Sequence, residues 1–250
     1  MAASSLGSLP LKYAWRSLRR APLFTITATL TLALGVGAVT AIFTVVNAVL
    51  LRPLPYAEAD QLVGMGHAAP GLNMGEVGQS MSTYFTYQKV NTSFESLGLY
   101  TSESMSLSDP LGGAQPERLR IASITPSVIP LLRAAPLRGR AFSEDEGRPN
   151  GARVVILSED FWRRRFGADP SLVGRTVQMD GHDVEVVGIM PAGFRFPDAG
   201  TQAWAPLVMD PAERMGGGFN WGGIGRLRAG VSVATAQADV ERGLTRVSEL

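Results

Sequence analysis

Side chains that commonly perform catalysis or bind metals are scarce in this sequence. Cysteine is absent, which excludes disulfide bonds, iron–sulfur clusters and thiol catalysis. There are two histidines, His67 and His182, and an imidazole-rich metal site would need more of them. No Gly-x-Ser-x-Gly nucleophile motif occurs either. The residue types therefore predict no catalytic site, no cofactor and no metal centre.

Three short runs look like sites but lack the rest of the required pattern. The run 215–225 is rich in glycine, yet no Lys-Ser or Lys-Thr pair follows it, so we expect a flexible loop that binds no phosphate. Arg163–Arg165 point three ways on a helix, because successive residues are ~100° apart, and they indicate a solvated face. The acids at 144–146 are consecutive, which suits a solvated helix start better than a catalytic carboxylate pair.

Charge is distributed unevenly along the chain. The residues up to Arg52 include five basic side chains and no acidic one, whereas the whole chain has a formal charge of +1. Residues 53–250 therefore carry a formal charge of −4. A nucleic-acid-binding protein would keep its positive charge on the folded domain, so we expect no nucleic-acid partner. A basic start joined to an acidic body is typical of a membrane-anchored protein.

An uncharged, apolar run extends from Ala21 to Leu51. A helix rises ~1.5 Å per residue and a bilayer core is ~30 Å thick, so roughly 20 residues suffice to cross it. We predict a transmembrane helix over residues 22–51. A buried helix of a soluble protein is the first alternative, although such helices are usually shorter and carry a polar stripe. A cleaved signal peptide is the second, although its apolar run spans only ~7–15 residues.

The basic residues on either side of this helix predict its orientation. Four of them precede it closely, and only Arg52 follows it before Glu58 and Asp60. The positive-inside rule then places residues 1–21 in the cytoplasm and the residues after 52 outside. We therefore expect a membrane protein, in contact with lipid, whose body lies outside the cytoplasm.

Two surfaces of this N-terminal part are candidate contact sites. Ala33, Gly37 and Ala41 recur every four residues and form a strip of small side chains that another helix could approach closely. Before the span, apolar and basic residues line adjacent sides of a predicted amphipathic helix that would lie in the membrane interface. A disordered basic segment is the alternative. The predicted interface residues are Leu11, Lys12, Trp15, Arg16, Leu18, Arg19 and Arg20.

The remaining residues, 58–250, predict an α+β body in which helices and strands alternate. Short strands are expected at residues 61–65, 118–124, 154–157 and 224–227. Residues 176–190 predict a β-hairpin, because Asp180 and Gly181 form a two-residue turn between alternating segments.

Capping residues mark most of the predicted helices of the body. Ser143 and Glu146 have the spacing of a capping box, and Ser158 begins a helix that Gly167 ends. Two other helices are expected at 83–90 and directly after Pro126. The predicted core residues of these two are Tyr84, Tyr87, Phe94, Val128, Ile129, Leu131 and Leu132.

The last predicted helix begins after Ser232. Its apolar residues have helical spacing, and the pattern still continues at Leu250, so we expect the sequence to be truncated. These apolar residues are Val233, Val240, Leu244 and Val247.

Several blocks of the sequence resemble one known family. The segment from Arg16 to Tyr56, with RSLRRAPLFT and LALGVGAVTAIFTVVNAVLLRPLPY, resembles the start of MacB/FtsX-type ABC transporter permeases, particularly the duplicated permeases of soil bacteria. Four later blocks resemble the MacB-like periplasmic core domain and follow in the family's order. They are ITPSVIPLL with APLRGRAF (124–142), VVILSEDFWRRRFG (154–167), VGRTVQMDGHDVEVVGIMP (173–191) and GRLRAGVSVATAQADV (225–240).

The resemblance implies a single transmembrane helix followed by a two-lobed mixed α/β periplasmic core. One lobe would comprise about 58–138 with 220–250, and the inserted lobe about 139–219. In the family, three further membrane helices follow the core, and a cytoplasmic ABC ATPase subunit drives the paired permeases. Neither ATPase motifs nor a second group of membrane helices occurs in this sequence.

The functional expectation is a non-catalytic permease component of an ATP-driven ABC export or mechanotransmission system. Its expected partners are other permease helices or a second permease half, the ATPase subunit and membrane lipid. The alternative is a membrane-anchored periplasmic binding or adaptor module that needs no ATPase.

Overall fold

A computed structural model describes residues 15–16, 18–46, 55–69, 74–108, 115–212 and 218–245. The chain divides into two compact units, Met1–Leu54 and Pro55–Leu250, which we describe separately. In the first unit, helix α2 (Pro22–Val46) agrees with the predicted span up to Val46, and the predicted continuation to residue 51 lies outside the described residues.

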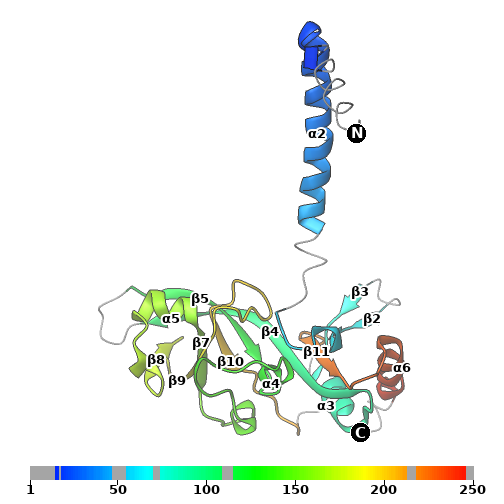
Figure 1. The fold of residues 1–250 in the computed structure, drawn as a ribbon. Helices are drawn as coiled ribbons and strands as arrows, with labels where there is room; N and C mark the ends of the chain where they lie inside the picture. The colour runs from blue at the N-terminus through cyan, green and yellow to red at the C-terminus, as the bar shows by residue number, and fades with distance from the viewer. Residues whose placement is uncertain are drawn as a thin grey trace, which may run out of the picture. The chain divides into compact units, whose positions relative to one another are not determined.

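The second unit is built on a nine-stranded sheet and a separate two-stranded one (Figure 1). The strands of the large sheet follow the order β1-β11-β4-β5-β10-β7-β9-β6, and β8 pairs with both β4 and β9. The strands are β1 (Leu62–Met65), β2 (His67–Ala69), β3 (Met74–Val77), β4 (Phe94–Ser108), β5 (Glu117–Ile124), β6 (Arg138–Gly139), β7 (Val154–Ser158), β8 (Thr176–Met179), β9 (His182–Met190), β10 (Ala203–Pro206) and β11 (Gly222–Leu227). The helices are α3 (Met81–Val90), α4 (Val128–Leu131), α5 (Glu159–Phe166) and α6 (Val233–Leu244), with short 3-10 turns at Ala59–Gln61, Glu144–Gly147 and Pro170–Leu172.

Six of these strands close into a ring. Their pairing runs from β4 through β5, β10, β7, β9 and β8 and returns to β4, where Leu107 lies opposite Met179. The ring encloses one buried apolar cluster, and α5 adds Phe161 and Trp162 to it. We call this element the six-stranded ring. Because it uses β4 and β5 together with β7–β10, it joins strands from both predicted lobes.

Two further apolar clusters lie outside the ring. One packs α4 against the other side of the sheet around Trp204, whose indole N–H donates to the carbonyl of Phe196 at 2.6 Å. The other packs α3 and α6 against β4 and β11, and it contains Tyr84, Tyr87 and Phe94, as predicted. Figure 1 shows α5 at one end of the body and α6 at the other. The division into two lobes stays a prediction.

Most predicted elements are confirmed, with small changes at their ends. Ser158 caps α5 and accepts the amide of Phe161, and Gly167 ends the helix with a φ of 58°. The hairpin of β8 and β9 turns at Asp180 and Gly181, both with positive φ. The strand predicted from residue 61 begins at Leu62, because the preceding residues form a 3-10 turn.

The prediction of a flexible loop over residues 215–225 is wrong for its second half, because residues 222–225 belong to strand β11. A Cβ on Gly222 would lie 2.3 Å from the ring of Tyr100, and one on Gly225 would lie 2.6 Å from the ring of Phe94. These glycines therefore allow aromatic side chains of the neighbouring strand β4 to cover β11. Glycine in a strand interior often marks such a close approach.

The apolar pattern of the last helix also needs correction. Helix α6 begins after Ser232 as predicted, but Val233 and Leu244 are 59% and 44% exposed. Its buried face consists instead of small or polar residues, Ala236, Asp239 and Gly243. A Cβ on Gly243 would lie 3.0 Å from the ring of Tyr87, so α6 approaches α3 closely. Residue 247 and the predicted continuation to 250 lie outside the described residues.

Candidate functional site: the membrane helix and the anchoring points of the body

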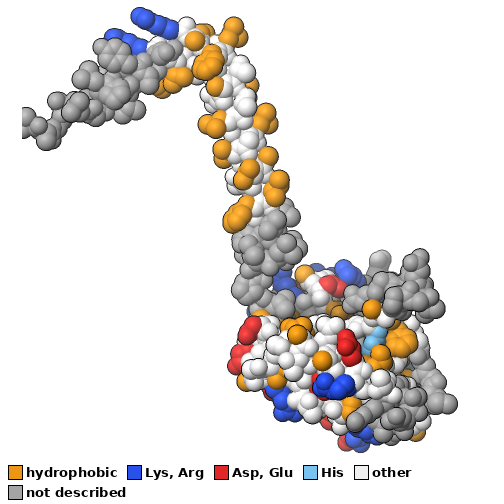
Figure 2. Space-filling model, turned by 90° about the vertical axis from the view of Figure 1, so that its right-hand side faces the viewer, with side chains coloured by type: hydrophobic (Ala, Val, Ile, Leu, Met, Phe, Trp, Pro, Cys, Tyr) orange, Lys and Arg blue, Asp and Glu red, His pale blue; other side chains and the backbone are white. Residues whose placement is uncertain are grey.

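Helix α2 has the surface of a membrane-spanning helix. Residues 22–44 are long and apolar enough to cross a bilayer, and none of this stretch is buried against the rest of the protein. Figure 2 shows hydrophobic side chains along its described length and basic side chains only at its start. Five threonine hydroxyls of the helix donate to carbonyls one turn earlier, for example Thr31 to Thr27 at 2.9 Å and Thr40 to Val36 at 2.7 Å. These bonds satisfy the hydroxyl groups inside an apolar medium.

The predicted small-residue strip is open on this helix. Ala33, Gly37 and Ala41 are exposed, and a Cβ on Gly37 would meet nothing within 4 Å. A second concave face, a groove of ≈ 680 Å³, runs past Thr27, Thr31 and Gly35. Gly35 and Gly37 are separated by about 200° around the helix axis, so the two faces point in nearly opposite directions.

The predicted interface segment is described only in part. Trp15, Arg16 and 18–20 are helical, Trp15 is 62% exposed, and the guanidinium of Arg19 lies 5.4 Å from the centre of the Trp15 ring. A tryptophan beside basic residues is typical of a helix end in the headgroup region. Leu11 and Lys12 lie outside the described residues.

The body begins with a segment that is held by a buried arginine. Arg226 on β11 is only 1% exposed, and its guanidinium donates to the carbonyls of Ala57 at 3.0 Å, Glu58 at 3.2 Å and Leu131 at 2.6 Å. Burial lowers the pKa of Arg226, and the nearby charge of Arg133 acts in the same direction. The planar fork of an arginine can satisfy several carbonyls at once, which an ammonium group cannot do with the same geometry. Ala57 and Glu58, at the start of the body, are thus tied to the sheet.

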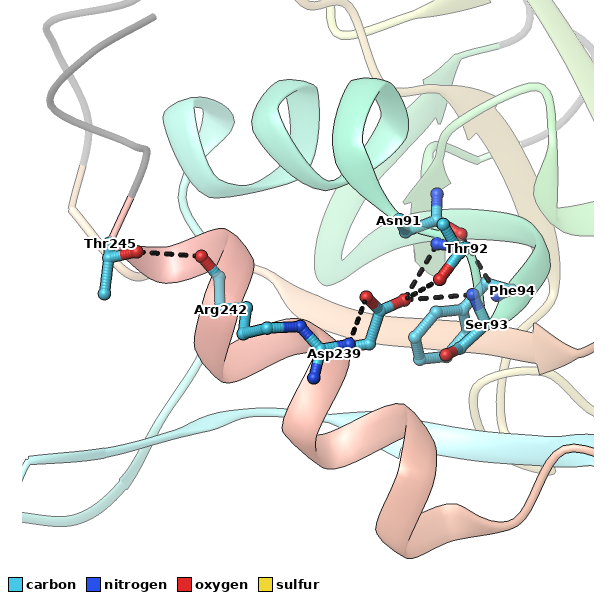
Figure 3. Close-up of polar contacts among 7 residues, drawn as sticks. All are labelled: Asn91, Thr92, Ser93, Phe94, Asp239, Arg242 and Thr245. Carbon is cyan, nitrogen blue, oxygen red and sulfur yellow. Dashed lines mark hydrogen bonds and ion pairs between the residues drawn. The ribbon is translucent and has the colours of Figure 1, made fainter.

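The last described helix is held by a buried carboxylate. Asp239 on α6 accepts hydrogen bonds from the amides of Thr92 at 2.8 Å and Ser93 at 3.0 Å, at the junction of α3 and β4 (Figure 3). Arg242, one turn later, donates to its other oxygen at 3.0 Å. Burial alone would raise the pKa of Asp239, but these backbone and hydroxyl donors outweigh burial and lower it to about 2.

The expectation that the acids at 144–146 are solvated is wrong for Glu146. Glu146 is 5% exposed, not solvated, and it forms a two-pronged ion pair with Arg140 at 2.7 and 3.0 Å. Its carboxylate also accepts the amide of Ser143 at 2.8 Å, which is the second half of the predicted capping box. Burial raises the pKa of Glu146, but Arg140 and Ser143 more than offset this and lower it overall.

The histidines and acids of the described residues are not gathered into a metal site, since no group of three such side chains is found there. His67 bonds the side-chain oxygen of Gln79 at 3.1 Å and packs edge-on against Phe219. His182 lies at the rim of a cleft of ≈ 560 Å³ at the end of the six-stranded ring away from α5. We call this cleft the ring mouth.

Comparison with known structures defines the fold. The periplasmic region of MacB from Actinobacillus actinomycetemcomitans superimposes with a TM-score of 0.56 at 17% identity, over 75% of this chain and 84% of that one. The extracellular domain of the noncanonic ABC-type transporter YknZ from Gram-positive bacteria gives 0.55 at 14% identity, over 75% and 94%. No curated protein sequence matches the chain. The body thus has the fold of the periplasmic region of MacB and of the extracellular domain of YknZ.

The family model for the MacB-like periplasmic core domain matches residues 25–242. The chain therefore belongs to this family, the periplasmic core of MacB/FtsX-type permeases. The match begins inside α2 and ends inside α6, so it includes the membrane helix as well as the body.

Sequence reasoning missed both anchoring residues. Arg226 stands in a strand of glycine and aliphatic residues, where a lone cation is an available signal of a buried, hydrogen-bonded group. Asp239 follows Ala236 by one helical turn, which places an acid on the face that packs. The partners of Arg226 and Asp239 are mostly backbone groups. Because every residue has such groups, the sequence does not indicate which of them will pair with these two side chains.

Proposed function

We propose that the chain is a non-catalytic permease component of an ATP-driven ABC system, which either exports a molecule or transmits mechanical work across the inner membrane. The observation that carries the proposal is the family match from inside the membrane helix to α6. It supports one continuous unit of membrane helix and periplasmic core, the arrangement that the family uses between an ATPase and the periplasm.

The anchoring points agree with a mechanical role. A membrane helix can move a body only if the connecting chain does not stretch, and fully extended residues 55–61 would span about 25 Å. Arg226 holds this segment against the sheet through the carbonyls of Ala57 and Glu58. With the segment fixed, a pull that reaches Ala57 would pass directly to β11 instead of being absorbed between residues 57 and 61.

The proposal places Trp15 in the cytoplasm, near an ATP-binding subunit. Because the chain has no cysteine, Trp15→Cys creates a unique cross-linking position. In membranes labelled with 8-azido-ATP, we expect a cross-linker at this position to join the chain to a labelled protein. Leu137→Cys, at a 51% exposed position of the body, should give no labelled product.

A labelled product from position 137 but not from position 15 would reverse the proposed topology. No labelled product from either position would favour the second candidate, a membrane-anchored binding or adaptor module. The ring mouth supports this second candidate, because a cleft at the end of a strand ring is a common place for a ligand.

A further inference from the structure

The ring mouth is formed by all six strands of the ring. Each strand contributes an inward-facing residue to its wall: Met105, Ser123, Ala205, Val155, Val184 and Met179. The volume, ≈ 560 Å³, lies within the roughly 300–1,000 Å³ of small-molecule pockets. The wall is mostly apolar, and two of its six residues are methionines, which adapt their shape to different ligands.

The ring mouth is unfilled because two neighbouring strands carry small side chains there. On the inward face of β5, Leu119 and Ile121 are followed by the smaller Ser123, and Ala205 of β10 lies directly opposite Ser123. At the other end of the ring, Phe161 of α5 fills the interior. Small side chains on two adjacent strands therefore leave the ring unfilled at this end.

The cleft carries groups of both charges, and its carboxylates have partners. Glu146 is paired with Arg140 at 2.7 Å, and Glu103, beside the wall, accepts the hydroxyl of Ser123. Arg148 is paired with Asp145 at 3.1 Å, and the carboxylate of Asp180 accepts the amide of Ser106 at 2.8 Å. By contrast, the exposed side chains of Arg153 and His182 have no hydrogen bond or ion pair among the described residues. The basic groups without a partner are thus a guanidinium and an imidazole, which can donate to an anion, and the amide of Asn150 at the same cleft can donate as well.

We propose that the ring mouth binds a small amphipathic molecule with an apolar body and one anionic group. The apolar body lies on the wall beside Met105 and Met179, and the anion is held by Arg153 and His182 at the rim. This inference does not depend on the permease role, because a binding or adaptor module would use the same site.

A photoreactive probe with this chemistry tests the proposal. 4-Benzoylbenzoate has an aromatic body and a carboxylate, and its excited ketone reacts readily with the C–H bonds of a nearby methionine. With the full chain in lipid nanodiscs, we expect saturable labelling of Met105 or Met179, located by mass spectrometry. The neutral 4-benzoylbenzamide should label the same residues about fivefold less, because it lacks the charge that the rim attracts.

Two variants and a control separate the parts of the site. Arg153→Glu should lower labelling by the carboxylate about tenfold and leave labelling by the amide unchanged, since reversing the charge turns attraction into repulsion. Ala205→Trp should remove labelling by both probes, because the indole fills the cleft. Arg195→Glu, at an exposed arginine in a different hollow, should change neither.

The proposal is overturned by labelling that does not saturate, that falls mainly on α2, or that survives Ala205→Trp in folded protein. Equal labelling by the two probes would disprove the anionic part. Arg153 is exposed, so the charge-reversal variant decides the question even if Ala205→Trp does not fold.

Discussion

Two buried charges of opposite sign, Arg226 and Asp239, stabilise the β11–α6 part of the body in the same way. Each is satisfied mainly by backbone groups from a distant segment, 57–58 in one case and 92–93 in the other. A buried charge with such partners is costly to disturb, because its removal leaves the backbone groups unpaired. Substitution at either residue should therefore affect stability more than substitution of an exposed neighbour.

For Asp239 the effect should depend on pH. Its pKa is about 2 in the folded protein and about 3.9 in an unfolded chain. Since the folded pKa is the lower one, the carboxylate stabilises the fold above about pH 4, and this stabilisation is lost as the pH falls toward 2. We expect Asp239→Asn to reduce the free energy of unfolding by about 1–3 kcal/mol at pH 7 and by much less at pH 2.

Urea unfolding of the body, followed by tryptophan fluorescence at both pH values, measures this difference. Arg242→Gln is the control, because Arg242 touches the same carboxylate but its side chain is 68% exposed, and it should cost less than about 1 kcal/mol. An equal loss for Asp239→Asn at pH 7 and pH 2 would contradict the assignment of the pH effect to this carboxylate.

At the scale of elements, α2 presents two faces that a partner helix could use. The strip around Gly37 has less apolar area but allows a close approach of another backbone, and the groove around Gly35 is a concave surface on the nearly opposite side. In the full-length permease we expect Gly37→Leu to weaken association between permease halves by at least about fivefold, because added bulk blocks helix packing, and to leave membrane insertion intact.

Gly35→Leu is the matched control, since it makes the same change on the nearly opposite face. Cross-linking and co-purification of tagged permease halves measure association, and membrane fractionation measures insertion. If Gly35→Leu disrupts association while Gly37→Leu does not, the groove is the interface. If neither has an effect, this helix serves only as an anchor.

Elements with local signals were predictable from the sequence. Ser158 and Gly167 bound α5 because caps depend on a few neighbouring residues, and Asp180 with Gly181 fixes the hairpin turn for the same reason. The sequence does not predict strand β4, because its serine-rich second half has the composition of a polar coil and its pairing comes from β5, β8 and β11. The ring mouth was equally invisible, since it depends on six separate strands.

At the scale of the molecule, the charge asymmetry predicts that the N-terminus is cytoplasmic and the body periplasmic. Alkaline phosphatase fused after Leu250 should be active, because it folds only outside the cytoplasm, and green fluorescent protein at the same position should stay dark. Fusions to a chain ending at Arg20 should show the reverse pattern. A bright fluorescent fusion after Leu250 would contradict this topology.

The position of β11 in the sheet affects how the body folds during synthesis and export. Among the described strands it is the last in sequence, yet it lies between β1 and β4, which come early. During synthesis and export, β1 and the first half of β4 therefore keep unpaired N–H and C=O groups until residues 222–227 have crossed the membrane. Such open edges attract other strands and are accessible to periplasmic proteases. We therefore expect the newly exported body to be prone to aggregation until strand β11 has paired with β1 and β4.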